Sequence, residues 1–531
     1  MKLNFVIFFI LFVQLLNAQN HFGRFESIDV QHYIFEIHLN DSTNQIEGKT
    51  NILLKFLKTA DSVQLDLIGQ NDSTTTGMKV ENVVIAGNSE KFIHKNNQLA
   101  INFGREIKAG ETINIGVIYS GIPADGLIIS ENKFGDRTFF GDNWPDRARF
   151  WLPVVDHPSD KATLEFLVFA PDQYKVVSNG MLQNEIHLGN GTTFTHWKEN
   201  VPISTKLMVI GVARFAVTES GEFNNIQVSS WVFPQNAEQG FWDFAAGMRP
   251  LAFFSEIIGP YSYEKLAHVQ SKTRYGGMEN ATCIFYAERA ISGKQQIEGL
   301  IAHETAHHWF GNSVTEQNWH HVWLSEGFAT YLTHLYKQYY RGESIFKNGL
   351  MEDRKQVIQF AKKKFAPVID TTVTDYLELL NANTYQKASW VLHMLRVTIG
   401  EENFNQTLQE YYRAFRNSTA VTADFQNIAE RVSRQELDDF FYQWLWQPGF
   451  PVLKWKWKQK TNGEIQLKIR QMQKTYLFRF PLEIQLIFTN GESRTETIHI
   501  SEKKIKAVFT SEQKIKNIQF DPEVKLLFEM K

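Results

Sequence analysis

The sequence predicts a multidomain protein, with an N-terminal antiparallel β domain, a middle α+β domain rich in helices and a small C-terminal β-sandwich. Three observations predict this class. The chain has 531 residues, more than one hydrophobic core usually organises. Its apolar pattern changes from alternation to a helical period near residue 241. Alternation returns after the breaker QPGFP at residues 447–451.

Short alternating segments separated by turn residues fill the first part of the chain. An apolar period of two between turn signals is typical of half-buried antiparallel strands. We therefore predict an N-terminal β domain at residues 19–215. Its clearest strand segments are 33–39, 52–56, 63–67 and 164–169.

Helical periodicity dominates the middle part, which we predict as a second domain at residues 216–447. The predicted helices are 295–310, 324–340, 345–362, 385–397 and 425–446. Short strands then return at 465–469, 482–488 and 496–500. About eighty residues of this kind suit a small β-sandwich at 448–531.

Residues 1–18 have the features of a signal peptide. Lys2 supplies the positive charge, residues 5–16 are mostly apolar, and Ala18 offers a small residue at the expected cut. The apolar run is too short for a comfortable membrane-spanning helix, and no other segment approaches ~18 apolar residues. We expect a secreted or periplasmic protein without a transmembrane segment in the mature chain.

Charge and cysteine content narrow the possible partners. The net charge of −3 gives no support to nucleic-acid binding. Cys283 is the only cysteine, so no intramolecular disulfide can form, and its apolar neighbours favour a small buried side chain. The KWKWK run at 454–458 could indicate a membrane or polyanion surface. However, alternation places Trp455 and Trp457 on one face, which favours a simple amphipathic strand.

The segment His303-Glu304-Thr305-Ala306-His307 carries the strongest chemical signal. Residues four apart lie on the same helix face, so both imidazoles can reach one metal ion. Glu304 can face a metal-bound water without binding the metal. His308 points about 100° away from His307, which favours a core or supporting role.

A catalytic zinc takes three protein ligands and leaves one position for water. Glu326 is the candidate third ligand, because it follows His307 after eighteen intervening residues and opens the next predicted helix. Taken alone, Glu326 could instead be a first-turn glutamate that favours the helix dipole. His320 and His321 lie in the connecting loop, where we expect solvated or packing side chains.

Two further segments complete a candidate site. The run GGMEN at 276–280 reads as extended, and its glycines allow close backbone approach to a ligand. Glu279 could hold a cationic amine by a charge-assisted hydrogen bond. Tyr385 opens a predicted helix and could present its hydroxyl to a developing oxyanion. Considered without the rest of the pattern, Glu279 is more often a surface glutamate and Tyr385 is more often a structural residue.

Together these segments resemble the zinc metallopeptidase family of membrane alanyl aminopeptidase and leukotriene hydrolase. The run at 276–280 is similar to that family's G-A-M-E-N exopeptidase motif, with Gly277 where alanine is commoner. Tyr385-Gln386-Lys387 looks like its catalytic Tyr-x-Lys. The other matching segments, spread over nearly the whole mature chain, are 303–312, 314–315, Trp319, 323–329, 29–33, 46–48 and 202–205.

The resemblance implies a saddle-shaped N-terminal β domain, a thermolysin-like catalytic domain and a small β-sandwich. It also implies a metallo-aminopeptidase that hydrolyses the first bond of peptides with a free N-terminus, using one zinc ion per chain and its bound water. Glu304 would be the general base, Tyr385 would stabilise the oxyanion, and Glu279 would anchor the substrate amine. The zinc ligands would be His303, His307 and Glu326. The remaining substrate-binding residues would be Gly276, Gly277, Met278 and Asn280.

The chain departs from the family pattern in two places. Many relatives carry a C-terminal helical domain, whereas this chain ends after the predicted sandwich. A more open site, or closure by a second copy in a homo-oligomer, follows as a hypothesis. Relatives also place a Glu or Gln in the N-terminal domain that helps to hold the substrate amine. Here Trp144 falls at that position, and Asp142 or Asn143 could substitute.

Three other functions share parts of this pattern. A thermolysin-like endopeptidase uses the same ligands but does not need Glu279. An epoxide hydrolase like leukotriene hydrolase uses the same zinc, but its relatives rely partly on the helical domain. An inactive scaffold would keep the fold without catalysis, yet the predicted ligands, base and tyrosine are all intact here.

Overall fold

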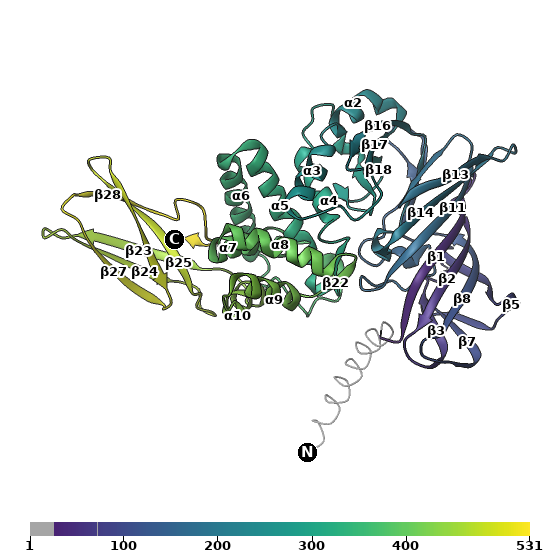
Figure 1. Cartoon of the computed structure of the whole chain (residues 1–531), viewed down its shortest axis with the longest axis horizontal. Helices are drawn as coiled ribbons and strands as arrows, with labels where there is room; N and C mark the ends of the chain where they lie inside the picture. Colours follow the sequence, from purple (N-terminus) through teal and green to yellow (C-terminus); the bar gives the residue numbers. More distant parts are fainter. Residues whose placement is uncertain (1–25, 72) are drawn as a thin grey trace, which may run out of the picture. The chain divides into compact units, whose positions relative to one another are not determined.

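The computed structural model describes residues 26–71 and 73–531, so the predicted signal peptide lies outside the described residues (Figure 1). The chain divides into two compact units. Unit 1 comprises Met1–Ser255, Pro260–Asn318 and Phe415–Thr419, and unit 2 comprises Glu256–Gly259, Trp319–Ala414 and Ala420–Lys531. This division falls inside the predicted 216–447 segment. The ranges given above for the signal peptide and the three domains stay a prediction.

An eight-stranded sheet of order β13-β14-β11-β1-β2-β8-β4-β5 begins unit 1. Its neighbouring strands run antiparallel except β1 and β11, which are parallel. The sheet is therefore mixed at one pair, which local alternation cannot reveal because the two strands are far apart in sequence. The strands are β1 (Ile28–His38), β2 (Ile46–Phe56), β4 (Gly77–Ile85), β5 (Asn88–Ser89), β8 (Thr112–Ile122), β11 (Lys161–Pro171), β13 (Met181–His187) and β14 (Thr192–Ser204).

Alternating apolar residues pack one face of this sheet into a core. Phe35 on β1 lies opposite Phe166 on β11, with ring centroids 5.0 Å apart. Tyr33 stacks on Phe35 at 5.1 Å, and Trp151 stacks on Phe166 at 6.0 Å. All four rings are fully buried, so the parallel pair lies at the centre of the apolar core.

Smaller sheets complete unit 1. A three-stranded sheet contains β3 (Ala60–Asp66), β6 (Phe92–Lys95) and β7 (Gln98–Ile107). A four-stranded sheet contains β9 (Leu127–Glu131), β10 (Arg137–Gly141), β12 (Lys175–Ser178) and β15 (Ile210–Ala213). A five-stranded sheet of order β16-β17-β18-β20-β19 contains β16 (Ala216–Phe223), β17 (Ile226–Val232), β18 (Lys265–Ser271), β20 (Cys283–Ala287) and β19 (Gly277–Met278). The two-stranded sheet is β21 (Val314–Glu316) with β22 (Ser418–Ala420), and the helices are α2 (Ala237–Phe244), α3 (Met248–Ile257) and α4 (Glu298–His307).

Helices form the first part of unit 2. They are α5 (Trp323–Arg341), α6 (Glu343–Ala361), α7 (Ala388–Ile399), α8 (Glu401–Phe415), α9 (Thr422–Ser433) and α10 (Asp438–Phe441). The single helix predicted at 425–446 is wrong, because Arg434 adopts φ 57° and ends α9 there. Among the described residues, no helix combines the length and the apolar character needed to cross a membrane.

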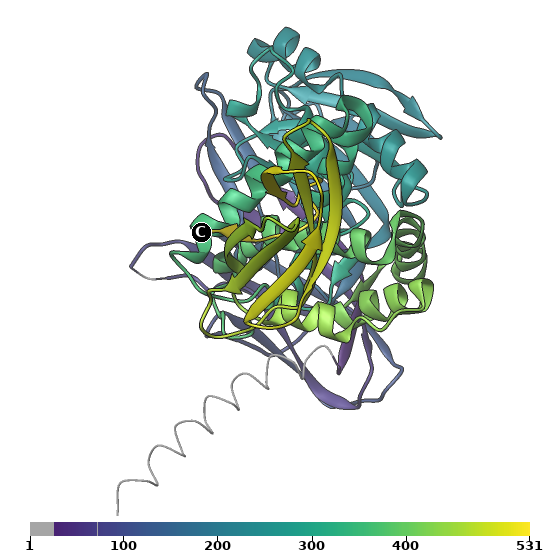
Figure 2. The same cartoon turned by 90° about the vertical axis from the view of Figure 1, so that its left-hand side faces the viewer.

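Two sheets end unit 2, and their strands are drawn in yellow in Figure 2. Trp455 on β23 packs on Phe520 of β28, with ring centroids 4.7 Å apart, so the apolar faces of the two sheets meet. The predicted alternation at 454–458 is confirmed, since Lys454, Lys456 and Lys458 are exposed and both tryptophans are half-buried. The strands are β23 (Val452–Gln459), β24 (Glu464–Gln471), β25 (Phe480–Phe488), β26 (Ser493–Ile500), β27 (Lys504–Thr510), β28 (Ile515–Phe520) and β29 (Glu529–Met530).

Candidate active site

The two histidines of the HExxH segment face the same way from α4. Nε2 of His303 lies 3.2 Å from Nε2 of His307, and the ring planes are nearly perpendicular at 86°. Nδ1 of His307 lies 3.3 Å from the carbonyl oxygen of Phe310. A proton donated there leaves the lone pair on Nε2, the tautomer that a metal requires. The donor chemistry of this pair therefore fits zinc.

Glu304 lies between these histidines in sequence and is 4% exposed. Its carboxylate lies against Gly277 on β19, because a β-carbon placed on that glycine would come within 2.3 Å of Oε1 of Glu304. The negative charge of Glu304 is also a cause, after burial, of the raised pKa of Tyr286 on β20. Gly277 thus leaves the space that the Glu304 side chain occupies.

Glu279 directly follows β19 and is 5% exposed. Among the residues that the structure describes, Oε1 of Glu279 has no hydrogen-bond partner. Possible ligand atoms of Glu279, Glu304 and His307 all lie within 4.8 Å of one another. A buried polar atom without a partner is costly, and a cationic ligand group would relieve that cost. The structure thus brings together the predicted amine anchor, the predicted base and one predicted metal ligand.

The segment around Gly277 and Met278 forms the edge of its sheet. β19 pairs antiparallel with β20, and its other edge has no strand partner among the described residues. The carbonyl oxygen of Glu279 accepts a hydrogen bond of 2.6 Å from Nδ2 of Asn312. Met278 and Asn280 are buried, while the backbone of Gly276 accepts a hydrogen bond from β20. The extended conformation predicted for this segment is confirmed at Gly277 and Met278, which form β19.

A buried network that we did not predict holds the chain after α4. Lys161 donates from Nζ to the backbone oxygens of Asn312 at 2.9 Å and Ser313 at 2.6 Å. Lys206 forms a 2.5 Å ion pair with Glu316, and both residues are 1% exposed. Burial raises the pKa of Glu316, while the charge of Lys206 opposes the shift. The partners are at least 110 residues apart, so no local pattern signals them.

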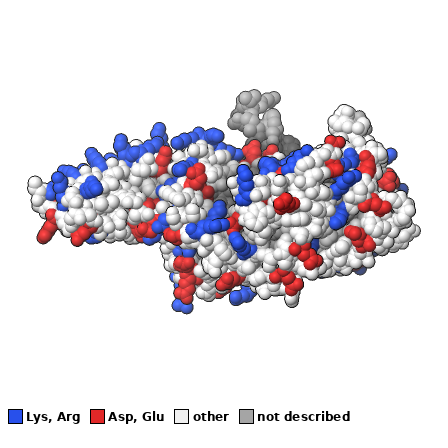
Figure 3. All heavy atoms as spheres, turned by 90° about the horizontal axis from the view of Figure 1, so that it is seen from above, with Lys and Arg blue, Asp and Glu red and all other residues white. Residues whose placement is uncertain are grey.

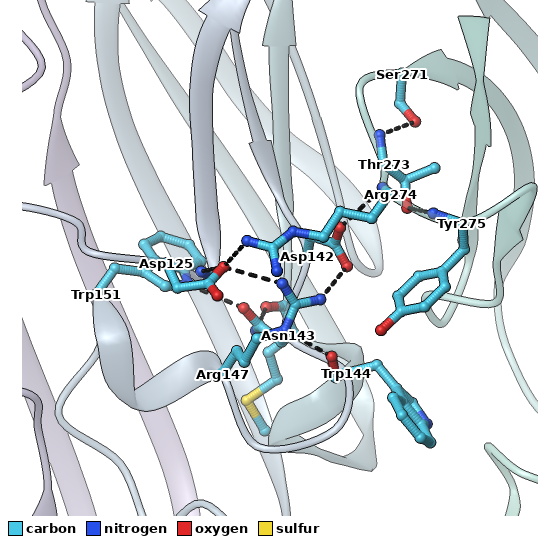
Figure 4. A network of polar contacts seen from close by, with 12 residues as sticks. Asp125, Asp142, Asn143, Trp144, Arg147, Trp151, Ser271, Thr273, Arg274 and Tyr275 are labelled. Carbon is cyan, nitrogen blue, oxygen red and sulfur yellow. Dashed lines mark hydrogen bonds and ion pairs between the residues drawn. The ribbon is translucent and has the colours of Figure 1, made fainter. Parts of the chain in front are cut away.

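Asp142, one of the two candidates for a second amine anchor, is fully buried in an ion-pair network (Figure 4). Its Oδ1 accepts 2.8 Å from Arg147, and its Oδ2 accepts 3.1 Å from the backbone N–H of Arg274. Arg147 also donates to Asp125 at 2.9 Å and to the carbonyl of Trp144 at 2.7 Å. Both carboxylate oxygens of Asp142 therefore accept hydrogen bonds from within the protein, so we assign Asp142 no role in binding a substrate amine.

Asn143, the other candidate, is also fully buried. Its Nδ2 donates to the carbonyl oxygens of Thr205 at 3.1 Å and Met208 at 2.6 Å. Its Oδ1 accepts 2.9 Å from Nε1 of Trp151. The side chain thus ties three parts of unit 1 together, and we assign it no role in binding a substrate amine.

Trp144, at the family's anchor position, packs on Tyr275, which precedes the GGMEN segment (Figure 4). The two rings make an edge-to-face contact with centroids 6.2 Å apart and planes at 83°. Burial raises the pKa of Tyr275 to about 12, and the charge of Glu279 contributes to the shift. Trp144 therefore packs on an aromatic ring of the segment that leads to Glu279, whereas the family resemblance implies a polar side chain at its position.

Glu326 and Tyr385 belong to unit 2. Glu326 lies in the first turn of α5 and is 5% exposed. Tyr385 lies in a π-helical turn, η7 (Asn383–Lys387), which leads into α7. A β-carbon on Gly327 would come within 2.5 Å of the β-carbon of Ala388, so Gly327 allows α5 and α7 to approach closely. π-turns of this kind are frequent at functional sites.

His308 and Cys283 pack inside unit 1. Nδ1 of His308 lies 2.7 Å from the hydroxyl of Tyr261, and burial lowers the pKa of His308 to about 3. Burial raises the pKa of the Cys283 thiol to about 12. Cys283 is thus the small buried side chain that we predicted.

His320 and His321 pack inside unit 2. Nε2 of His320 lies 3.1 Å from the carbonyl oxygen of Val373. Nδ1 of His321 lies 2.8 Å from the hydroxyl of Thr422, and burial lowers the pKa of His321 to about 4. Both side chains therefore contact their own unit as packing residues.

Two family models match the chain. The Peptidase M1 N-terminal domain matches residues 29–207, and the Peptidase family M1 domain matches residues 242–444. The chain belongs to peptidase family M1. The second match contains α4 with both histidines, Glu279, Glu326 and Tyr385, so the candidate residues lie inside the family's peptidase region.

This M1 family member is similar to several curated aminopeptidases. Aminopeptidase M1-C of Oryza sativa subsp. japonica is 29% identical over 327 residues, which are 59% of this chain and 37% of that protein. Probable aminopeptidase 1 of Saccharolobus solfataricus is 25% identical over 441 residues, which are 79% of this chain and 53% of that protein. Glutamyl aminopeptidase of Sus scrofa is 27% identical over 330 residues, which are 59% of this chain and 35% of that protein. The matches thus span about half or less of these relatives' length.

Proposed function

We propose that this M1 family member is a zinc-dependent aminopeptidase that removes the first residue from peptides with a free N-terminus. The observation that carries the proposal is the buried Glu279 carboxylate, which has one oxygen without a partner in the described chain and lies beside Glu304 and His307. An α-ammonium group suits this oxygen in charge and hydrogen bonding. An endopeptidase, whose substrates continue past this point, has no need of it.

His303, His307 and Glu326 are the proposed ligands of one zinc ion. Two imidazoles and a carboxylate form a donor set typical of catalytic zinc. The converging Nε2 atoms of the two histidines and the hydrogen-bonding position of Nδ1 of His307 support it within unit 1. Glu326 is proposed as the third ligand because the family resemblance implies a glutamate ligand at this position. When bound, the ion would polarise the substrate carbonyl and lower the pKa of a water molecule.

Each residue has a proposed part in the hydrolysis. Glu304 takes the proton from the attacking water and passes it to the leaving amine. Tyr385 donates a hydrogen bond to the oxyanion that develops on the carbonyl. Glu279 holds the ammonium group, which sets the register so that the first peptide bond is the one cleaved. The unpaired edge of β19 can hydrogen-bond the substrate backbone as an added strand.

The finer assignments of fold and location are also proposals. The mixed eight-stranded sheet and the helical region fit the saddle domain and thermolysin-like domain that the family resemblance implies. The two C-terminal sheets fit a small β-sandwich, since their apolar faces meet at Trp455 and Phe520. The sequence pattern of residues 1–18 supports a cleaved signal peptide and a secreted or periplasmic location.

The decisive experiment compares free and blocked substrates on the mature chain. We expect hydrolysis of aminoacyl-arylamides with a free amine, loss of that activity with a chelator, and recovery on addition of zinc. The same compounds with an acetylated amine should not be cleaved. Internal cleavage of acetylated peptides at a comparable rate would instead identify an endopeptidase, and activity unaffected by complete removal of metal would contradict the zinc proposal.

A further inference from the structure

The outward face of the C-terminal sheet β27-β24-β23-β29 concentrates positive charge. Directly paired residues of neighbouring strands point to the same side of a sheet. Strand pairing places six exposed basic residues in two rows that cross β23, β24 and β27. The first row is Lys454, Arg470 and Lys504, and the second is Lys456, Lys468 and Lys506. We call these six residues the basic face.

Two acids lie on the same side of this sheet as the basic face: Glu464 at the start of β24, and Glu529 of β29, which pairs with Val452. Glu529 lies 3.9 Å from Lys362. The next row along the same side is Lys458, Gln466 and Val508, which adds a seventh positive charge. Among the described residues, none of the six forms an ion pair within 4.0 Å. Glu464, which starts β24, is instead paired with Lys460 at 3.0 Å. In Figure 3, Lys and Arg side chains gather along one border of the molecule over the C-terminal sheets.

The outward face of the second sheet, β26-β25-β28, provides a contrast within the same region. Its paired outward positions contain no Lys or Arg and one acid, Glu483, which is paired with Lys525 at 2.7 Å. These positions are Pro481 with His499, Glu483 with Thr497, Gln485 with Thr495 and Gln519, and Ile487 with Ser493 and Asn517. The accumulation of charge is therefore specific to one sheet and does not follow from outward exposure alone.

This arrangement works against the stability of the sheet. Adjacent strands lie about 4.8 Å apart and same-face neighbours about 7 Å apart, so the six charges occupy roughly 10 by 7 Å at the backbone. These separations lie within or near the Debye length of about 8 Å at physiological ionic strength. Like charges placed directly opposite each other in a sheet are destabilising. An amphipathic strand needs polar residues at its outward positions, but these residues can be neutral, acidic or basic. The amphipathic pattern therefore does not explain why the outward residues of β23, β24 and β27 are basic.

We propose that the basic face docks this protein onto a membrane surface rich in anionic phospholipids. The charges spread over three strands in two dimensions, which suits a plane of phosphate headgroups more than a single linear polymer. Single-stranded nucleic acid would need aromatic side chains for base stacking. Trp455 and Trp457 point to the opposite side, where Trp455 packs on Phe520. The six residues of the basic face include no apolar side chain, and Val508 in the adjacent row is the exposed apolar neighbour, so we expect an electrostatic and reversible contact.

The test is co-sedimentation of the mature chain with lipid vesicles. We expect binding to vesicles of phosphatidylcholine and phosphatidylglycerol in equal parts, and no binding to vesicles of phosphatidylcholine alone. Binding should weaken steeply with added salt, because the Debye length falls to about 3 Å at 1 M. Absence of binding to the anionic vesicles at low salt would overturn the proposal, as would equal binding to both compositions.

Two matched triple variants locate the contact. Lys456→Glu, Lys468→Glu and Lys506→Glu together reverse one row, and we expect the partition coefficient to fall by about 100-fold or more. The control carries the same charge change at exposed lysines outside the basic face, Lys474→Glu, Lys514→Glu and Lys516→Glu. The control should bind within a few-fold of the natural protein. An equal loss in both variants would overturn the docking face.

Two further measurements test whether a loss of vesicle binding reflects unfolding, and whether the basic face binds nucleic acid instead of a membrane. Both triple variants should keep the thermal unfolding temperature of the natural protein. If the row variant unfolds, Lys454→Gln with Lys504→Gln replaces it, and full retention of vesicle binding by that variant would overturn the proposal. Duplex DNA at the same salt provides the second measurement. Row-dependent binding to DNA without binding to vesicles would also overturn it.

Discussion

Replacing Glu279 with glutamine tests the amine anchor directly. Glu279 is 5% exposed, so solvent screens its charge little, and its Oε1 has no competing donor among the described residues. A hydrogen bond to a charged group contributes about 1.5–3 kcal/mol. Loss of the carboxylate should therefore lower kcat/KM for substrates with a free amine roughly 10- to 150-fold. Folding should not suffer, because the replaced oxygen loses no bond within the protein.

The assay measures kcat/KM for an aminoacyl-arylamide together with the thermal unfolding temperature of each variant. Glu316→Gln is the control, since Glu316 is also a buried carboxylate, at 1% exposed, and pairs with Lys206 at 2.5 Å. Breaking that pair leaves a buried lysine charge and should cost about 3–5 kcal/mol of stability. The reasoning is refuted if Glu279→Gln keeps full activity, or if it loses as much stability as Glu316→Gln.

Three further predictions concern the base, the oxyanion donor and a buried acid. Glu304→Gln should retain zinc by elemental analysis but lose nearly all turnover; an unchanged kcat would refute its role as base. Tyr385→Phe should lower kcat more than it raises KM, by about 2.7–4 kcal/mol in transition-state energy, whereas a change confined to KM would argue against it. Burial raises the pKa of Asp160 from 3.8 to about 8. As the pH rises from 3.8 towards 8, Asp160 therefore loses its proton in the unfolded chain but keeps it in the folded protein, and the free energy of unfolding falls. Asp160→Asn keeps the acceptor for the Val30 N–H at 3.2 Å and should raise the unfolding temperature at pH 8 but not at pH 4; the same gain at both values would contradict this.

Local patterns predicted those features whose causes are local. The helical spacing of His303 and His307 placed both rings on one side of α4, and they converge as expected. Alternation at 454–458 likewise predicted which side chains of β23 face outward. The break after α9 was missed, because Arg434 adopts a left-handed conformation that its residue type does not announce.

Long-range pairing accounts for most of what could not be predicted. Asp142 and Asn143 looked available for a substrate amine, but their partners include Arg274 and Met208, which lie 132 and 65 residues away. The contrast between the two C-terminal sheets emerges only when Lys456, Lys468 and Lys506 are set side by side by strand pairing. Local sequence windows contain none of these neighbours.

The position of β1 has a practical consequence for producing the protein. This strand begins at Ile28, close to the predicted start of the mature chain, yet it is hydrogen-bonded to β2 on one side and β11 on the other. A deletion that removed it would divide the large sheet into two pieces with newly unpaired edges, which are prone to aggregate. Expression tags at this end therefore need a spacer before Ile28. During synthesis, β1 cannot complete its pairing with β11 until Pro171 has left the ribosome.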